Sequence, residues 1–359
     1  MSQSDWSSDV CSSDLMKKNF KFKFLSVILV ISIVIFITPV HALSINESNI
    51  EPIDSKYYEK FIKDYIYALE EINPSVTFKD VLYDPYDNSK VAYLYSVENG
   101  YAIIGINSMN IYEFSLSTDN PYRSLIGKKY YSGYFEYYDS SKVHIYEKYK
   151  FSEESSMMFG MEKNTSLSVQ KNNRDDFVIK ANSVKKLSRA LPTDWVNGYC
   201  GPTSAYNMLK YKSYVPLSYT SGTDAIKYIN SLINPNGGSG VSLSTLTNGM
   251  NKALSNWGYV KRVSSTSYSF PLIKQQINKD CPLTLGTSGG GLATGGHVQT
   301  VHGYAELTVS TTSISTLNMP TATSPTYVIY VNNSWGKNDV TLSYTGNPPT
   351  YLKDHVYYV

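Results

Sequence analysis

Residues 197–204 read Asn-Gly-Tyr-Cys-Gly-Pro-Thr-Ser, and this run places Cys200 where we expect a helix to begin. Pro202 fits that position, because proline is tolerated in the first turn of a helix. The N-terminus of a helix is the positive end of its dipole, and it lowers the pKa of a cysteine thiol. The stretch therefore predicts a reactive thiolate at Cys200, opening a helix over residues 200–211.

Two later motifs supply the partners that a nucleophilic thiol needs. Residues 295–297 read Gly-Gly-His, and residues 331–336 read Val-Asn-Asn-Ser-Trp-Gly. A histidine can take the thiol proton and return it to a leaving amine, while a third polar side chain orients the imidazole. We therefore predict Cys200 as nucleophile, His297 as general base and acid, and Asn333 as the orienting residue. His302 lies on the same expected strand but outside the glycine-histidine motif, which makes it the weaker candidate for the base.

In their order and context, these motifs resemble the Cys-His-Asn set of papain-fold cysteine peptidases. Asn-Ser-Trp-Gly is similar to the asparagine segment of papain-like enzymes. Cys-Gly-Pro-Thr-Ser followed by Gly-Gly-His-Val is closer to the bacterial branch that includes bacteriocin-processing-type peptidases. The resemblance covers roughly Leu191 to Gly336. It implies an α+β fold, in which a papain-like peptidase domain follows an α+β prodomain with an antiparallel sheet.

One position departs from the resemblance, six residues before the nucleophile. These families usually carry a glutamine there, whose amide helps to stabilise the oxyanion, whereas this chain has Asp194. A carboxylate repels the developing negative charge. Asn197 and Asp194 are the side-chain oxyanion candidates, and the backbone N–H of Cys200 is expected to contribute in either case. The departure leaves open a catalytically inactive binding module.

The N-terminal residues predict processing segments rather than folded structure. Residues 1–15 resemble a translated sequencing adapter and are interpreted as a non-native extension. Residues 16–42 combine a basic flank, an apolar run over residues 24–37 and a terminal Ala42, the pattern of a secretory signal peptide. An uncleaved membrane anchor is the alternative, although the run is shorter than the ~20 residues that a span prefers. A signal peptide predicts a secreted or cell-surface bacterial protein.

Between the signal and the peptidase motifs we expect an α+β propeptide-like domain over residues 43–161. Helical periodicity covers residues 56–71, and Asn99-Gly100 is a hairpin signal. Short apolar runs broken by turns predict strands at residues 91–97, 101–106, 111–116, 130–138 and 143–149. This segment loosely resembles the prosegments of streptopain-like enzymes, which implies a zymogen inhibited by its own propeptide. Residues 162–190 are polar and predict an exposed linker, with a possible activation site at residues 185–190.

Residues 191–359 are then the peptidase domain. Beyond the nucleophile helix, periodicity predicts helices over residues 223–232, 244–257 and 271–277, followed by strands that include residues 297–304 and 327–332. Cys281 is expected to be a small buried residue at a strand, and a Cys200–Cys281 bridge is the alternative.

Composition excludes several other classes of function. The formal net charge is +2, and there is no basic cluster beyond the signal and the stretch at residues 185–189, so nothing suggests nucleic-acid binding. Histidine and cysteine pairs do not occur at metal-ligand spacings, so we expect no metal and no cofactor. The sequence predicts a secreted cysteine peptidase, made as a zymogen, that acts on protein or peptide substrates through an acyl-enzyme on Cys200. The alternatives are a cell-wall peptide amidase or transpeptidase with the same triad, or the inactive binding module.

Overall fold

The computed structural model describes residues 55–106, 110–143, 145, 176–235, 241–288, 296–312, 325–336 and 339–359. The chain divides into two compact units, Met1–Ile45 and Asn46–Val359, and every described residue belongs to the second unit. The expected adapter extension and signal peptide lie outside the described residues. Within the described ranges, no helix is long and apolar enough to cross a membrane.

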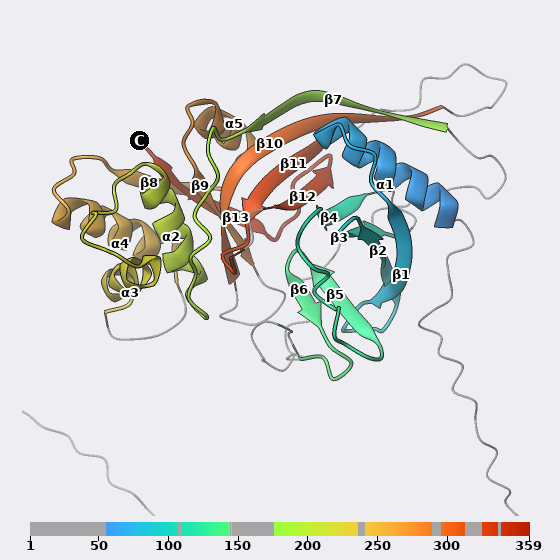
Figure 1. The fold of residues 1–359 in the computed structure, drawn as a ribbon, viewed down its shortest axis with the longest axis horizontal. Helices are drawn as coiled ribbons and strands as arrows, with labels where there is room; N and C mark the ends of the chain where they lie inside the picture. Colours follow the sequence, from blue (N-terminus) through green and yellow to red (C-terminus); the bar gives the residue numbers. More distant parts are fainter. Residues whose placement is uncertain are drawn as a thin grey trace, which may run out of the picture. The chain divides into compact units, whose positions relative to one another are not determined.

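The described residues form an α+β fold, as the sequence predicted (Figure 1). The helices are α1 (Ser55–Glu70), α2 (Cys200–Tyr211), α3 (Gly222–Ile233), α4 (Leu243–Asn256) and α5 (Phe270–Asn278). The strands are β1 (Val76–Tyr83), β2 (Lys90–Val97), β3 (Gly100–Gly105), β4 (Ile111–Ser115), β5 (Lys129–Gly133), β6 (Glu136–Tyr138), β7 (Asp176–Lys186), β8 (Val263–Ser267), β9 (Leu283–Ser288), β10 (Gly296–Thr312), β11 (Pro325–Asn332), β12 (Val340–Thr345) and β13 (Leu352–Tyr358).

All of these strands belong to one sheet. Its order is β6-β5-β1-β2-β3-β4-β12-β11-β10-β9-β13-β8, and β7 pairs with β10 beside that path. The pairs are antiparallel except for β1 with β5, so the sheet is mixed. The predicted helices over residues 200–211, 223–232 and 244–257 are confirmed as α2, α3 and α4, with bounds that differ by at most one residue. Strand β1 was not predicted.

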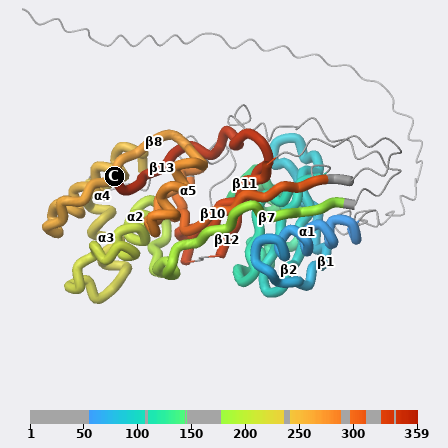
Figure 2. The backbone as a smooth tube through the Cα atoms, turned by 90° about the horizontal axis from the view of Figure 1, so that it is seen from above, coloured from blue at the N-terminus to red at the C-terminus, as the bar shows by residue number. Residues whose placement is uncertain are grey.

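Helix α1 packs on the sheet through one apolar face. Phe61, Ile62, Tyr65 and Ile66 repeat at helical spacing and are at most 1% exposed. The ring of Phe61 meets that of Phe177 on β7 edge to face, with centroids 5.1 Å apart. Figure 2 shows α1 alongside β7 and next to β1 and β2. The same apolar cluster includes Leu307 of β10 and Val328 of β11, so the N-terminal segment packs against strands of the peptidase-motif region.

The expected hairpin at Asn99-Gly100 joins β2 to β3, and its glycine is sterically required. A Cβ on Gly100 would lie 2.0 Å from the backbone oxygen of Ser115, on the neighbouring strand β4. No side chain fits in that space. Only glycine at this position lets β3 and β4 pair at their observed spacing.

Strand β4 connects the two halves of the sheet by pairing with β12. Next to the pairing of β4 with β12, the Asp339 carboxylate accepts hydrogen bonds from the Ser115 hydroxyl (2.7 Å), the Ser117 backbone N–H (2.8 Å) and the Thr118 hydroxyl (2.5 Å). Burial alone raises the pKa of Asp339, but the hydrogen bonds from Ser117, Thr118 and Ser115 lower it below its ordinary value. One half-buried carboxylate thus ties the N-terminal segment to the C-terminal half.

Strand β7 corrects the expected linker. Residues 176–186 are not an exposed tether but pair antiparallel with β10, from Thr312↔Asp176 to Gly303↔Lys186. The strand is polar because much of one face is exposed to solvent: Val178 is 58% exposed, whereas Phe177 is 6% exposed. A strand with a solvated face carries too few apolar residues to be distinguished from a linker by composition. The first part of the expected linker lies outside the described residues.

A buried carboxyl group lies in the core of the N-terminal half. Glu113 on β4 is 0% exposed, and its Oε1 accepts a hydrogen bond from the Tyr137 hydroxyl at 2.5 Å. The Phe135 backbone N–H donates to Oε2 at 3.4 Å. Burial raises the pKa of Glu113 from 4.5 to about 8. Glu113 is therefore protonated at neutral pH, and it holds the turn that follows β5.

This pKa predicts that alkaline pH weakens the fold. The folded protein keeps a proton on Glu113 that the unfolded chain releases, so stability declines as pH rises from about 4.5 to about 8 and then levels off. Glu113→Gln removes the titrating group. We expect its melting temperature at pH 9 to exceed that of the wild type by roughly 5 °C or more. Thermal unfolding at pH 5 and pH 9 measures the difference.

Glu71→Gln is the matched control, because the Glu71 side chain is exposed. It should follow the wild type at both pH values. If Glu113→Gln loses as much stability as the wild type between pH 5 and pH 9, Glu113 is not the titrating group.

Candidate active site

Helix α2 begins at Cys200, as the sequence predicted. A turn with Gly198 at φ +77° leads into it, and the helix starts with a hydrogen bond from the Thr203 N–H to the Tyr199 carbonyl (2.8 Å). The N-cap residue, Tyr199, makes no side-chain capping bond. The first N–H groups of α2 thus lack an N-cap side chain, and the half-buried Cys200 thiol lies at the positive end of the helix.

His297 lies at the start of β10 and is 4% exposed. Its Nε2 is 2.7 Å from the backbone oxygen of Asn333. A carbonyl oxygen can only accept, so Nε2 carries the proton and, in the neutral ring, Nδ1 is left with the lone pair. The structure thus brings His297 and Asn333 together. It differs from the expectation in one respect: the hydrogen bond goes to the main-chain oxygen of Asn333.

The loop after β11 is held by its own asparagine side chains. Asn333 Oδ1 accepts from the Trp335 N–H (3.0 Å), and Asn332 Oδ1 accepts from the Ser334 N–H (2.8 Å). These are successive Asx turns. Asn332 also donates through Nδ2 to the carbonyl of Pro192 at 3.1 Å. The loop is therefore fixed both internally and to the segment that leads into α2.

Two aromatic rings enclose the His297 imidazole. Trp335 stacks on it with a centroid distance of 4.1 Å and an interplanar angle of 24°, and its ring shields the His297–Asn333 hydrogen bond from water. Phe135 meets the imidazole edge to face at 5.4 Å and meets Trp335 at 5.9 Å. Phe135 is 1% exposed and belongs to the turn between β5 and β6. A residue of the N-terminal segment thus packs directly on His297.

Sequence reasoning missed Phe135, because residues 130–138 read as one continuous strand. The observed chain makes a turn there, with Gly133 at φ +153° and Phe135 at φ +66°. The glycine inside the apolar run is the local sign of that turn.

The two oxyanion candidates have different surroundings. Asp194 accepts a hydrogen bond from the Tyr206 hydroxyl at 3.1 Å, and its carboxylate lies against Gly222, the first residue of α3. Burial and the neighbouring Asp194 carboxylate both raise the pKa of Tyr206, so this hydroxyl stays protonated and donates. Asp194 thus acts as an acceptor at the start of α3. Asn197 is exposed in the turn before Cys200.

A hollow of about 440 Å³ adjoins the site. Asn333 and Trp335 form one side of it. The rest comes from the loop after β4, namely Thr118, Asp119, Asn120, Pro121, Arg123 and Ser124. The N-terminal segment therefore covers the surface next to the proposed catalytic residues.

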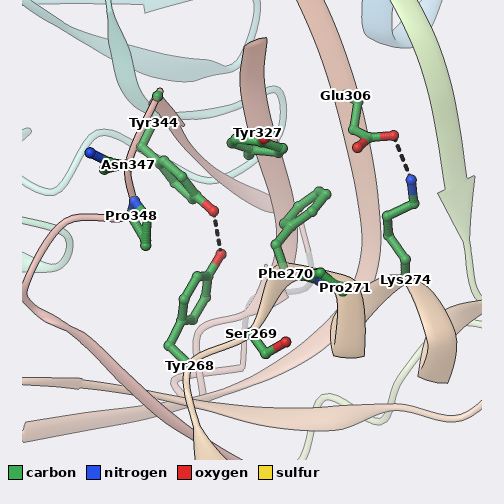
Figure 3. A pocket seen from close by; sticks show the side chains of 11 residues that line it. Tyr268, Ser269, Phe270, Pro271, Lys274, Glu306, Tyr327, Tyr344, Asn347 and Pro348 are labelled. Carbon is green, nitrogen blue, oxygen red and sulfur yellow. Dashed lines mark hydrogen bonds and ion pairs between the residues drawn. The ribbon is translucent and has the colours of Figure 1, made fainter.

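A larger hollow of about 590 Å³ has another lining, which does not include the predicted catalytic residues (Figure 3). Phe270, Tyr327 and Tyr344 present aromatic rings to it, and Tyr268 and Tyr344 are joined by a hydroxyl–hydroxyl hydrogen bond of 2.8 Å. The ion pair between Lys274 and Glu306 borders it.

The second cysteine of the described chain is separate from this chemistry. Cys200 and Cys281 are both half-buried and are not joined by a disulfide, so the alternative of a bridge between them is wrong in this structure. In the ranges that the structure describes, no group of three or more His, Cys, Asp or Glu side chains could hold a metal ion.

Comparison with known protein families agrees with the motifs. Residues 180–347 match the model described as the Peptidase_C39 like family, a match that includes Cys200, His297 and Asn333. The match begins within β7. No curated protein matches the chain. The family match confirms the resemblance to papain-fold cysteine peptidases.

The two histidines of β10 give a direct test of the site. We expect His297→Ala to slow alkylation of Cys200 by iodoacetamide at pH 6 more than about tenfold, because the thiolate loses its imidazolium partner. His302→Ala should stay within about twofold of the wild type, since His302 faces Tyr330 instead, at a ring distance of 6.2 Å. Peptide mapping by mass spectrometry measures the rate at Cys200 separately from that at Cys281. The reverse order of effects would make His302 the base.

Proposed function

Since the family match places residues 180–347 among papain-like cysteine peptidases, we propose that this chain is a secreted bacterial cysteine peptidase. It is made as a zymogen and hydrolyses peptide bonds through an acyl-enzyme on Cys200. The observation that carries this proposal is the 2.7 Å hydrogen bond between His297 Nε2 and the Asn333 oxygen, under the stacked ring of Trp335.

The geometry supports a sequence of proton transfers. With its proton on Nε2 held by Asn333, His297 takes the Cys200 proton at Nδ1, and the resulting thiolate attacks the peptide carbonyl. The imidazolium then gives this proton to the departing amine, and an acyl-enzyme forms. Water attacks the thioester with His297 as base, which releases the acid and restores the thiol. Trp335 excludes water from the bond that orients the ring.

The oxyanion is stabilised by the start of α2. The backbone N–H of Cys200 belongs to the first turn of this helix, where N–H groups lack intrahelical acceptors. Asn197 supplies the side-chain amide that Asp194 cannot. The bond from Tyr206 occupies the Asp194 carboxylate as an acceptor, which supports a structural role for Asp194 at α2 and α3.

Contacts of the N-terminal segment support a propeptide that inhibits its own peptidase. Phe135 covers His297, and the loop at residues 118–124 lies beside Asn333 and Trp335, where substrate would approach. Asp339 accepts hydrogen bonds from Ser115, Ser117 and Thr118 at the base of that loop, with Ser117 donating through both its N–H and its hydroxyl. A peptide substrate therefore needs the Phe135 turn and the loop to move away.

Strand β7 stays with the catalytic unit after maturation. It pairs with β10, the strand that begins with His297, and the family match starts within it. The backbone of the expected activation site at residues 185–190 is also hydrogen-bonded: the Leu187 N–H donates to the His302 carbonyl (2.8 Å), and the Ser188 N–H donates to Asp280 (2.8 Å). Hydrogen-bonded backbone resists proteolysis.

The first experiment is to incubate purified residues 43–359 with reductant and follow the intact mass. We expect self-cleavage that Cys200→Ala abolishes, and a mature peptidase that still contains β7, because a cut at residues 185–190 would separate β7 from β10. Peptide release from casein should accompany maturation. Amine release from peptidoglycan instead would indicate the cell-wall amidase.

If the chain does not cleave itself, and shows no activity on casein or peptidoglycan after limited cleavage by trypsin, the inactive binding module would be indicated. A mature chain that begins within residues 186–190 would show that β7 is part of the propeptide.

Shortening the Phe135 side chain should activate the unprocessed chain. We expect Phe135→Ala to raise the rate at which a peptidyl chloromethyl ketone labels Cys200 by roughly tenfold, because truncation of a buried aromatic ring loosens the turn on His297. Ile126→Ala is the control in the same segment, since Ile126 is 94% exposed. Phe135→Leu, which keeps apolar bulk, should fall between the wild type and Phe135→Ala. Unchanged labelling in Phe135→Ala would exclude this contact as an inhibitory one.

A further inference from the structure

Ser204 lies one helical turn after Cys200 on α2, and it is completely buried. Residues four apart share a helix face, so Ser204 projects from the same side of α2 as the nucleophile. Its hydroxyl oxygen is 3.0 Å from the backbone oxygen of Val298 and 2.8 Å from the hydroxyl oxygen of Ser334.

The direction of both hydrogen bonds follows from the chemistry. A carbonyl oxygen can only accept, so the Ser204 proton points to Val298. A hydroxyl has one proton, so in the second bond Ser204 accepts and Ser334 donates. The result is a chain from Ser334 through Ser204 to Val298, in which each hydrogen bond polarises the next.

Both partners of Ser204 are neighbours of proposed catalytic residues. Val298 directly follows His297 on β10, and Ser334 directly follows Asn333 in the loop after β11. One hydroxyl on the nucleophile helix thus connects the strand that carries the base with the loop that orients it.

Ser334 needs this support. It has φ +59°, a left-handed conformation that is costly for a residue with a side chain. Its N–H donates to Asn332 and its hydroxyl to Ser204. These two bonds help to hold the conformation that aims the Asn333 carbonyl at His297.

We propose that Ser204 is a positioning residue that fixes Cys200, His297 and Asn333 relative to one another. It does so through its hydrogen bonds to Val298 and Ser334. The inference rests on the proposed function, in which Cys200 and His297 exchange a proton.

The test compares Ser204→Ala with Thr203→Val. Thr203 is the adjacent α2 residue, also 0% exposed, and its hydroxyl makes no hydrogen bond within the described part of the chain. Both changes remove one buried hydroxyl, but only Ser204→Ala breaks the connection. The pH dependence of Cys200 alkylation by iodoacetamide is the first readout, and kcat and KM on a peptide substrate are the second.

We expect Ser204→Ala to move the pH profile of alkylation toward that of an ordinary thiol, near pH ~8.5, and to lower kcat about tenfold with KM within about twofold. Thr203→Val should keep the wild-type profile and kcat. Ser334→Ala removes the loop end of the connection and should shift the profile in the same direction but less. The double variant should resemble Ser204→Ala, because the two hydroxyls act as one unit.

An ordinary thiol profile in the wild type would overturn the proposed function and this inference with it. A perturbed wild-type profile that Ser204→Ala leaves unchanged, or that Thr203→Val shifts equally, overturns the positioning role alone. If Ser204→Ala fails to fold, Ser334→Ala is the deciding variant. An unshifted pH profile of Cys200 alkylation in Ser334→Ala would then overturn the positioning role of Ser204.

Discussion

The hydrogen-bonded pairing of strand β10 is the constraint on which the rest of the structure depends. β10 pairs with β11 along one edge and with β9 and then β7 along the other. This pairing aligns the start of β10 with the end of β11, so His297 and the Asn333 carbonyl meet. Because backbone hydrogen bonds of a central strand cannot shift one by one, the two residues are held in place before any substrate binds.

Polar groups fix the remaining parts of the site to this strand. The hydroxyl of Ser204 connects α2 to Val298 and Ser334, and the amide of Asn332 connects the loop to Pro192. These groups are buried, so each lost partner leaves a donor or acceptor unsatisfied and costs about 1–3 kcal/mol. The same principle holds the N-terminal segment at Asp339, where one carboxylate accepts hydrogen bonds from Ser115, Ser117 and Thr118. The proposed active form and the proposed inhibited form therefore depend on the same kind of contact.

Much of the peptidase half was predictable because its signals are local. The start of α2 at Cys200 follows from Pro202 in its first turn, and α3, α4 and α5 follow from apolar periodicity. Strand β7 was not predictable in this way, since its neighbour β10 lies more than a hundred residues later and its exposed face is polar. Phe135 was missed for the same reason, because its partner His297 is distant in the sequence.

The sequence by itself determined the fold class, the resemblance to papain-fold cysteine peptidases, the order of Cys200, His297 and Asn333, and the helix that begins at the cysteine. These follow from motifs and from periodicities that act over a few residues. Only the tertiary structure decided that the Asn333 main-chain oxygen binds His297, that Ser204 joins their two segments, and that Phe135 covers the imidazole. Such contacts depend on strand register and on the packing of residues far apart in the chain, which no local pattern encodes.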